Sequence, residues 1–207
     1  FYFEAMPKIS DEKRAARRTQ ILEAAWTCFQ KEGLHATTMD DIIRASGLSA
    51  GAVYSYYPSK DELILAAVTT SLSGLTALVA PLMQAAPAPA PAALLQQIAA
   101  TIDRFTAREG YDLKRVALLG WAEAQRNERL RTTMRGFYLA FREQLEQAIG
   151  RAVQAGPLVP EADPKNAAKT LLALIVGFVV QDALLHDVEP EELSQGLAAL
   201  ATPLRRD

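Results

Sequence analysis

Apolar residues recur three or four positions apart along nearly the whole chain, which is the spacing of one face of an α-helix. Alternating runs of β-branched residues and Asn-Gly hairpin signals, which are typical of strands, are nearly absent. The pattern therefore predicts an all-α fold. We expect nine helices, which begin near Ser10, Thr38, Ser49, Ser59, Ala93, Asp112, Glu128, Asp163 and Pro190.

Glycine and proline mark where these helices end. Gly33 and Gly47 are expected to close the first and second helices, because glycine readily adopts the left-handed conformation of a helix C-terminus. Pro58 prevents continuation of the third helix, and Pro81 is expected to end the fourth. The fifth helix is expected to run to about Arg108, and Gly110 is expected to separate it from the sixth.

Composition excludes several classes of protein. Half of the 207 residues are apolar, so a core can form and the chain is not intrinsically disordered. The net charge of -2 argues against a uniformly basic nucleic-acid coat, so any DNA contact must come from a local patch. Cys28 is the only cysteine, which excludes an intramolecular disulfide and fits a reducing cytoplasm. The most apolar run, residues 171–180, predicts a buried helix because it is too short to span a bilayer.

Residues 37–63 carry the clearest functional signal. Two short helical patterns are joined by a tight turn at Gly47, and a third helix follows with a capping box formed by Ser59 and Glu62. This layout is typical of a helix-turn-helix unit that lies on DNA.

The helix after Gly47 has an inner and an outer face. At about 100° per residue, Val53 and Tyr57 share the inward face with Ala50. Gly51 and Ser55 lie on the opposite side. Small residues at the start of this helix leave its outer face unobstructed, which suits entry into the major groove and brings the helix amides near a phosphate.

Several side chains around this helix suit contacts with phosphate. Tyr54 and Tyr56 are phenols on an exposed turn, and half-buried packing is the alternative for both. Lys60 adds a cation, and Thr38 offers a hydroxyl and an amide at the start of a helix. A basic cluster near the chain start either steers the protein toward phosphate or forms a solvated helix face; it consists of Lys8, Lys13, Arg14, Arg17 and Arg18.

The motif resembles the signature of the TetR family of bacterial transcriptional regulators. The resemblance rests on Thr37-Thr38-Met39, Ile42, Gly47-Leu48-Ser49 and the run from Val53 to Leu63. It covers about 50 residues and is specific; over the rest of the chain it is only architectural. The resemblance implies a nine-helix homodimer that represses transcription and releases DNA when it binds a small molecule.

The resemblance also implies which residues contact DNA. Phosphate contacts carry over to Thr38, Tyr54 and Lys60, and base-reading positions carry over to Met39, Ala50, Gly51 and Ser55. The base-reading side chains are short and mostly apolar, so sequence recognition is expected to rely on thymine methyls, DNA shape or the N-terminal arginines. The full set expected to bind DNA is Thr38, Met39, Ser49, Ala50, Gly51, Tyr54, Ser55, Tyr56 and Lys60.

Four segments follow from this organisation. Residues 1–9 are expected to be a disordered arm, with residues 1–5 left over from cloning ahead of a native Met6. Residues 10–58 form the helix-turn-helix domain, 59–80 a connecting helix, and 81–207 the ligand-binding and dimerisation domain.

The eighth helix is apolar on more than one side, so it needs cover on more than one side. A partner subunit is the simplest cover, and packing within the chain is the alternative. Two helices from each chain would form a four-helix bundle. The residues expected at this interface are Leu171, Leu174, Ile175, Val179, Leu193, Leu197 and Leu200.

Aromatic and scattered polar residues in the fifth to eighth helices suit a mostly apolar cavity, although such residues also form ordinary cores. The residues expected to bind a ligand are Phe105, Trp121, Tyr138, Phe141, Phe178 and Gln181. Asp182 and His186 are four residues apart, but two ligands do not make a metal site, and we expect a surface or interface pair.

No catalytic set, phosphate-binding loop or cofactor motif is present in the sequence, so we expect no enzyme, no cofactor and no metal. The sequence predicts a cytoplasmic, nucleoid-associated regulator that binds palindromic operator DNA as a homodimer and is released by a small, mostly apolar or amphipathic effector. The alternative is a DNA-binding protein without an effector, whose body docks a protein partner.

Overall fold

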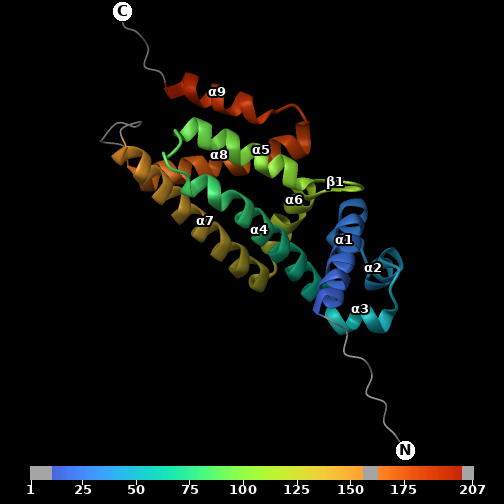
Figure 1. Cartoon of the computed structure of the whole chain (residues 1–207). Helices are drawn as coiled ribbons and strands as arrows, with labels where there is room; N and C mark the ends of the chain where they lie inside the picture. The colour runs from blue at the N-terminus through green and yellow to red at the C-terminus, as the bar shows by residue number, and fades with distance from the viewer. Residues whose placement is uncertain (1–10, 156–162, 202–207) are drawn as a thin grey trace, which may run out of the picture. The chain divides into compact units, whose positions relative to one another are not determined.

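The computed structural model describes residues 11–155 and 163–201, which form nine α-helices and one short β-hairpin (Figure 1). The expected all-α fold with nine helices is thereby confirmed. The arm at residues 1–9 and the end of the chain lie outside the described residues. The elements are α1 (Asp11–Ala36), α2 (Met39–Ser46), α3 (Ala50–Tyr56), α4 (Lys60–Gln84), α5 (Pro91–Thr106), β1 (Ala107–Arg108), β2 (Tyr111–Asp112), α6 (Leu113–Ala124), α7 (Glu128–Gln154), α8 (Pro164–Leu185) and α9 (Pro190–Ala201).

The chain divides into two compact units, of which the first ends at Val68 and the second begins at Thr69. The division falls inside α4, so this helix contributes its first part to one unit and its remainder to the other. It also falls inside the segment 59–80 that the sequence suggests as a connecting helix.

The first unit packs α1, α2 and α3 around a small apolar core. Its most deeply buried side chains include Ile21, Phe29, Ile42 and Val53, each at most 1% exposed. Tyr57 is buried beside them, as the helical periodicity predicts, whereas Ala50 is exposed, which corrects its expected inward position. Ala50 is the first residue of α3, one turn before the residues that reach the core.

In the second unit, α5 packs against both α8 and α9, and α7 packs against α8 (Figure 1). Apolar side chains of these helices and of α4 form the core of this unit. Its buried residues are Val79, Met83, Leu94, Leu95, Ile98, Ala99, Ile102, Leu145, Ala148, Ile149, Ala168, Leu171, Ile175 and Phe178.

Two expectations about helix ends are wrong. Pro81 does not end α4, which continues to Gln84. A proline inside a helix removes one hydrogen bond, but Met83, just beyond it, is 2% exposed in the core, and its burial favours continuation. The fifth helix does not reach Arg108, because α5 ends at Thr106. A hairpin with two residues in each strand follows, and it turns at Gly110, which has a φ of 88°. Such a short ladder leaves no alternating pattern in the sequence.

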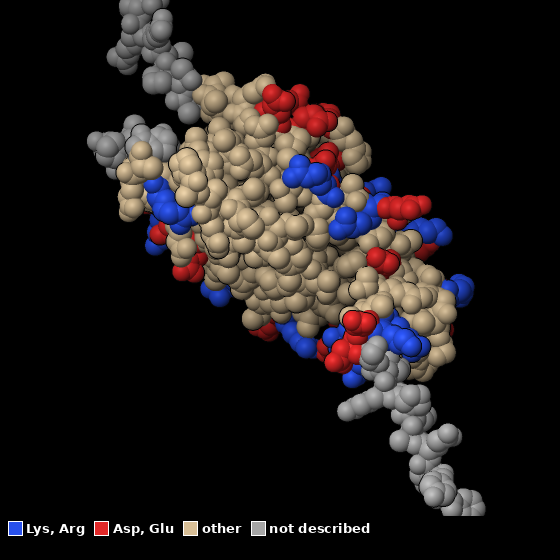
Figure 2. Space-filling model, in the orientation of Figure 1, with Lys and Arg blue, Asp and Glu red and all other residues tan. Residues whose placement is uncertain are grey.

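Two helices are more apolar than the sequence reading suggested. α4 and α8 each have the length and mean hydropathy, 1.9 and 1.8, of a membrane-spanning helix, so the short run at 171–180 understated the apolar length of α8. Core helices of soluble proteins meet the same criterion. Only 22% and 28% of these apolar windows are buried within the chain, and Figure 2 shows a wide surface without charges over the middle of the second unit. Both helices therefore keep apolar surface uncovered.

Near its end α1 kinks at Gly33, the expected end of the first helix, whose φ of 82° and ψ of 165° are not helical and lie in a region that other residues rarely adopt. We predict that Gly33→Ala lowers the free energy of unfolding of the first unit by about 1–3 kcal/mol, through backbone strain alone. An added Cβ would meet no atom within 4 Å. Urea denaturation followed by circular dichroism measures the change.

The matched control is Gly51→Ala in α3, where an added Cβ is also in open space but the backbone is helical. This variant should keep or gain stability, by up to about 1 kcal/mol. Equal losses in the two variants would contradict the role of the Gly33 backbone.

Candidate functional site

The N-terminus of α2 is capped by Thr38 and Asp41. The Thr38 backbone N–H and hydroxyl both donate to Asp41 Oδ2, at 2.9 and 2.6 Å, and the Asp41 backbone N–H donates to the Thr38 hydroxyl oxygen at 3.2 Å. These bonds favour the ionised carboxylate and therefore lower the pKa of Asp41, the bond from the Thr38 hydroxyl more than the bond from its N–H. In this arrangement an internal carboxylate holds both donors that the sequence assigned to a DNA phosphate.

The turn into α3 is formed by Gly47, which has a φ of 67° and donates its N–H to the Arg44 carbonyl. Ser49 then caps α3, since its hydroxyl accepts from the Ala52 N–H at 3.3 Å. The helix therefore starts directly after the turn, as a helix-turn-helix requires.

The outer surface of α3 is small and polar. Gly51, Ser55 and the 45%-exposed Tyr54 lie on it together with Ala50. Ser55 donates its hydroxyl to the Ala52 carbonyl at 2.7 Å, so only its oxygen lone pairs remain for a base or phosphate.

The remaining predicted DNA-binding residues are less exposed. Met39 on α2 and Tyr56 at the end of α3 are half-buried. Tyr57, which the sequence assigned to the core, has a raised pKa because burial disfavours its phenolate. Of the basic cluster, Lys8 lies outside the described residues, and the exposed N-terminal part of α1 carries Lys13, Arg14, Arg17 and Arg18.

Lys60, at the start of α4, ties this helix to the turn between α1 and α2. Its ammonium donates to the backbone carbonyls of His35 and Thr37, at 3.0 Å each. Thr37 is itself buried and donates its hydroxyl to the Gly33 carbonyl at 2.7 Å. An ammonium has three donors, so Lys60 retains one for a phosphate. Sequence reasoning missed this structural role, because no pattern links Lys60 to a turn 23 residues earlier.

A cavity lies in the second unit. Its volume is about 550 Å³ when the space that is open to solvent is included. It is lined by residues of α4 to α8: Leu72, Leu75, Thr76, Val79, Ile98, Ile102, Trp121, Phe137, Tyr138, Phe141, Leu172, Ile175, Val176 and Val179. The volume open to the centre of a water molecule is about 80 Å³, which leaves room for a small ligand only. Sequence reasoning missed the four α4 residues of this wall. They lie at positions 72, 75, 76 and 79, a spacing that places them on one face of the helix.

Three of the six predicted ligand-binding residues, Trp121, Tyr138 and Phe141, line the cavity. The other three do not. Phe105 packs close to Gly74, where an added Cβ would lie 3.0 Å from its ring, Phe178 is 1% exposed in the core, and Gln181 is exposed.

Two polar groups of the cavity wall bond to each other. The Trp121 indole N–H on α6 donates to the Tyr138 hydroxyl on α7 at 2.7 Å. Burial raises the pKa of Tyr138, and the bond from Trp121 opposes this shift only in part. Tyr138 therefore stays a neutral phenol at physiological pH.

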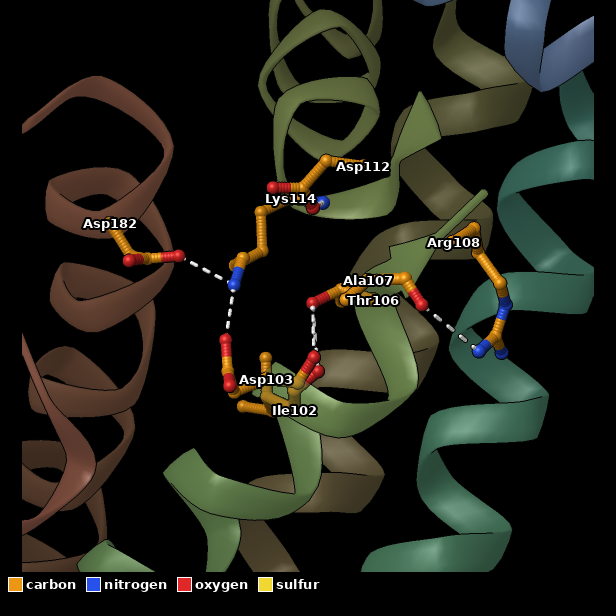
Figure 3. Close-up of polar contacts among 8 residues, drawn as sticks. All are labelled: Ile102, Asp103, Thr106, Ala107, Arg108, Asp112, Lys114 and Asp182. Atoms are coloured by element: carbon orange, nitrogen blue, oxygen red, sulfur yellow. Dashed lines mark hydrogen bonds and ion pairs between the residues drawn. The ribbon is translucent and has the colours of Figure 1, made fainter. Parts of the chain in front are cut away.

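An ion cluster around the buried Lys114 joins α5, α6 and α8, and its Asp103 side chain is 50% exposed (Figure 3). The Lys114 ammonium lies between Asp103, at 2.6 Å, and Asp182, at 2.5 Å, and its side chain is 4% exposed. Burial alone would lower the pKa of Lys114, but the bonds to both carboxylates outweigh it and raise the pKa. Sequence reasoning missed this cluster, because its two acidic partners lie 11 and 68 residues from Lys114 and no local pattern links them.

Asp182 is thus committed to Lys114 rather than to a metal with His186. The part of the chain that the structure describes contains no group of three residues able to hold a metal ion.

The predicted dimer residues fall into three environments. Leu171 and Ile175 are buried, and Ile175 also lines the cavity together with Val179. Leu174, Val179, Leu193 and Leu197 are half-buried against the core. Leu200 is 88% exposed.

Two family profiles match the chain. One, described as bacterial regulatory proteins of the tetR family, matches residues 21–67, and one described as the C-terminal part of a BetI-type transcriptional repressor matches residues 106–204. The chain is 31% identical over 199 residues to YfiR of Bacillus subtilis (strain 168), described as an uncharacterized HTH-type transcriptional regulator. That match covers 94% of this chain and 93% of its relative.

Solved structures share the fold. A transcriptional regulator from Saccharomonospora viridis in complex with choline is 21% identical, with a TM-score of 0.73, over 90% of this chain and 95% of that one. A SmeT–triclosan complex is 24% identical, with a TM-score of 0.72, over 89% of this chain and 91% of that one.

The capping geometry at α2 predicts how Asp41 titrates. Because its folded pKa is lowered, the Thr38–Asp41 bonds stabilise the first unit above the ordinary aspartate pKa, and this contribution is lost as the pH falls through the lowered value. Thr38→Val removes the hydroxyl, which is the largest cause, and should raise the pKa of Asp41 in a carboxyl NMR titration.

Thr27→Val is the control, since the Thr27 hydroxyl donates to the Glu23 carbonyl on α1 and not to a carboxylate. An Asp41 titration that is the same in the parent and in Thr38→Val would show that the hydroxyl does not hold this carboxylate.

Proposed function

Since the chain belongs to the TetR family of bacterial regulatory proteins, we propose that it is a repressor that binds palindromic operator DNA as a homodimer and leaves it when a small molecule binds. As a member of this family it is a DNA-binding transcriptional regulator with a helix-turn-helix, and not an enzyme. A bacterial regulator of this kind works in the cytoplasm, and association with the nucleoid follows from operator binding.

The observation that carries the proposal is the outer surface of α3. Ala50 and Gly51 leave its first turn open, so the helix can lie against base edges in the major groove. Met39, Ala50, Gly51 and Ser55 are the proposed base-reading positions. Their short side chains favour thymine methyl contacts and readout of DNA shape, supported by the arginines of α1.

Phosphate contacts surround this surface. Tyr54 and Tyr56 offer hydroxyls, Lys60 offers its third N–H, and Ser49 adds a hydroxyl at the start of α3. Thr38 differs from these, because Asp41 already holds its two donors. A phosphate that approaches Thr38 therefore competes with this carboxylate, which makes Thr38 the weakest of the proposed phosphate contacts.

The proposed dimer is based on apolar surface of α8 and α9 that the chain itself does not cover. α8 is largely apolar, but only 28% of its most apolar window is buried within the chain, and Leu184, Leu185 and Leu200 are 64%, 60% and 88% exposed. A second copy would bury these side chains together with the outer part of Leu174 in a four-helix bundle of α8 and α9. Two recognition helices could then meet successive major grooves, about 34 Å apart.

The cavity supports a small, mostly apolar effector. It is formed by α4 to α8 of the second unit, and it includes Trp121, Tyr138 and Phe141 from the predicted set. The choline and triclosan complexes of proteins with this fold indicate that the fold accommodates small molecules. The same cavity argues against the alternative of a protein-docking body without an effector, which would need no internal space.

α4 is the proposed link between effector and DNA. This helix carries Lys60 in the first unit, and Leu72, Leu75 and Val79 line the cavity in the second. A ligand that moves the cavity wall moves α4, and through Lys60 it moves the turn that precedes α2. Coupling between two such sites is typically about 1–3 kcal/mol.

DNA binding is tested by selecting the operator from random duplexes with the full chain and measuring affinity as a function of salt. Lys60→Met should weaken binding to every duplex and reduce the salt slope by about one, because one phosphate contact is lost. Ser55→Ala and Met39→Ala should instead change sequence preference more than general affinity.

Lys60→Arg is the matched control, since it keeps the charge and should keep the slope. A slope that is unchanged in Lys60→Met would mean that Lys60 serves only as the tie to His35 and Thr37. Failure to select any duplex would reject the proposed function.

Dimerisation is tested on Leu200, the most exposed of the large apolar side chains that the structure describes. Leu200→Glu should raise the dimer dissociation constant at least about tenfold in sedimentation equilibrium, because burying a leucine contributes about 1.5–3 kcal/mol. Leu78→Glu, which changes a 51%-exposed leucine on α4, should leave the constant unchanged. An equal effect of both substitutions would argue against an interface formed by α8 and α9.

A further inference from the structure

The wall of the cavity carries no formal charge. Its 14 lining residues are aliphatic or aromatic except for one threonine, and its polar side-chain atoms are the Thr76 hydroxyl, the Trp121 indole N–H and the Tyr138 hydroxyl. A ligand inside it can therefore form very few hydrogen bonds and no ion pair with the wall.

Two of these three donors are already used. The Thr76 hydroxyl donates to the Leu72 carbonyl at 2.8 Å, within α4. The Trp121 N–H donates to the Tyr138 oxygen at 2.7 Å. The Tyr138 hydroxyl thus accepts one bond, and among the described residues its own hydrogen has no acceptor. This hydrogen is the single donor left for a bound molecule.

Three carboxylates close along the chain to lining residues are also paired elsewhere. Asp103 follows Ile102, and Asp182 lies three residues after Val179, but both pair with Lys114. Glu123, two residues after Trp121, forms an ion pair with Arg126 at 3.5 Å. None of these carboxylates lines the cavity.

A cation in this cavity would lose its hydration without gaining a counter-charge. Four aromatic residues, Trp121, Phe137, Tyr138 and Phe141, could attract it through their ring faces. That attraction offsets only part of the lost hydration, because an ion buried without a partner is strongly disfavoured.

We infer that the cavity selects neutral apolar molecules with one hydrogen-bond acceptor, which the Tyr138 hydroxyl holds, and that it rejects organic cations of the same shape. Aryl ketones, esters and ethers belong to this class, and quaternary ammonium compounds do not. The inference deepens the proposed function and rests on the cavity being its effector site. Burial favours the neutral phenol of Tyr138, which keeps this donor available.

Two pairs of isosteric probes test the inference, through displacement of the neutral fluorophore N-phenyl-1-naphthylamine from the full chain without DNA. tert-Butylbenzene and phenyltrimethylammonium differ only in charge, and acetophenone and α-methylstyrene differ only in a carbonyl oxygen. We expect the ammonium compound to bind at least about tenfold more weakly than tert-butylbenzene.

The carbonyl pair tests Tyr138 itself. The ratio of acetophenone affinity to α-methylstyrene affinity should fall about two- to tenfold in Tyr138→Phe, which is the contribution of one ordinary hydrogen bond. Tyr54→Phe makes the same chemical change in the first unit, outside the cavity, and should leave the ratio unchanged.

Three results would overturn the inference: ammonium binding as tight as that of tert-butylbenzene, a ratio unaffected by Tyr138→Phe, or no displacement by any of the four probes. The charge pair is measured on the parent protein, so it stays decisive if Tyr138→Phe folds poorly. Because no DNA is present, these results are independent of operator release. A neutral ligand that binds as expected but leaves operator affinity unchanged would refute the effector role and not the selectivity of the cavity.

Discussion

The apolar surface of α8 is the constraint on which the second unit depends. One side of this helix, including Leu171 and Phe178, lies in the core against α5 and α7. A second side, including Leu172 and Val176, forms part of the cavity wall. The remaining surface is left to solvent, since only 28% of the most apolar window is buried. Core, ligand site and dimer interface are thus three ways of covering one helix, and the latter two are our proposals.

The most deeply buried charge that the structure describes in this unit is Lys114. The ammonium of Lys114 is buried, and Asp103 and Asp182 neutralise it from α5 and α8 (Figure 3). An ion cluster around a buried ammonium is weak evidence for stability, because desolvation opposes the attraction between the ions. It does fix where α5, α6 and α8 meet. Neither carboxylate lines the cavity, whose wall is uncharged, and our inference about the class of ligand rests on that wall.

The sequence predicted most of the fold and part of the site, and the failures have physical reasons. Nine helices and the family followed from helical periodicity and from the motif at residues 37–63, and both are confirmed. Local rules failed where tertiary packing decided: Met83 in the core carries α4 past Pro81. Periodicity also could not tell which apolar side of α8 faces the cavity, so Phe178 was assigned to the ligand although it lies in the core. Contacts distant in sequence, such as those of Lys60 and Lys114, leave no local pattern.

The central claim is that occupation of the cavity in the second unit weakens DNA binding by the first. The most direct measurement is a fluorescence anisotropy titration of the selected operator with the full chain, with and without saturating acetophenone. The account predicts that the ligand raises the operator dissociation constant about 5- to 150-fold. It also predicts that Tyr138→Phe needs more ligand for the same release. An operator affinity that stays the same while the cavity is demonstrably occupied would contradict the account.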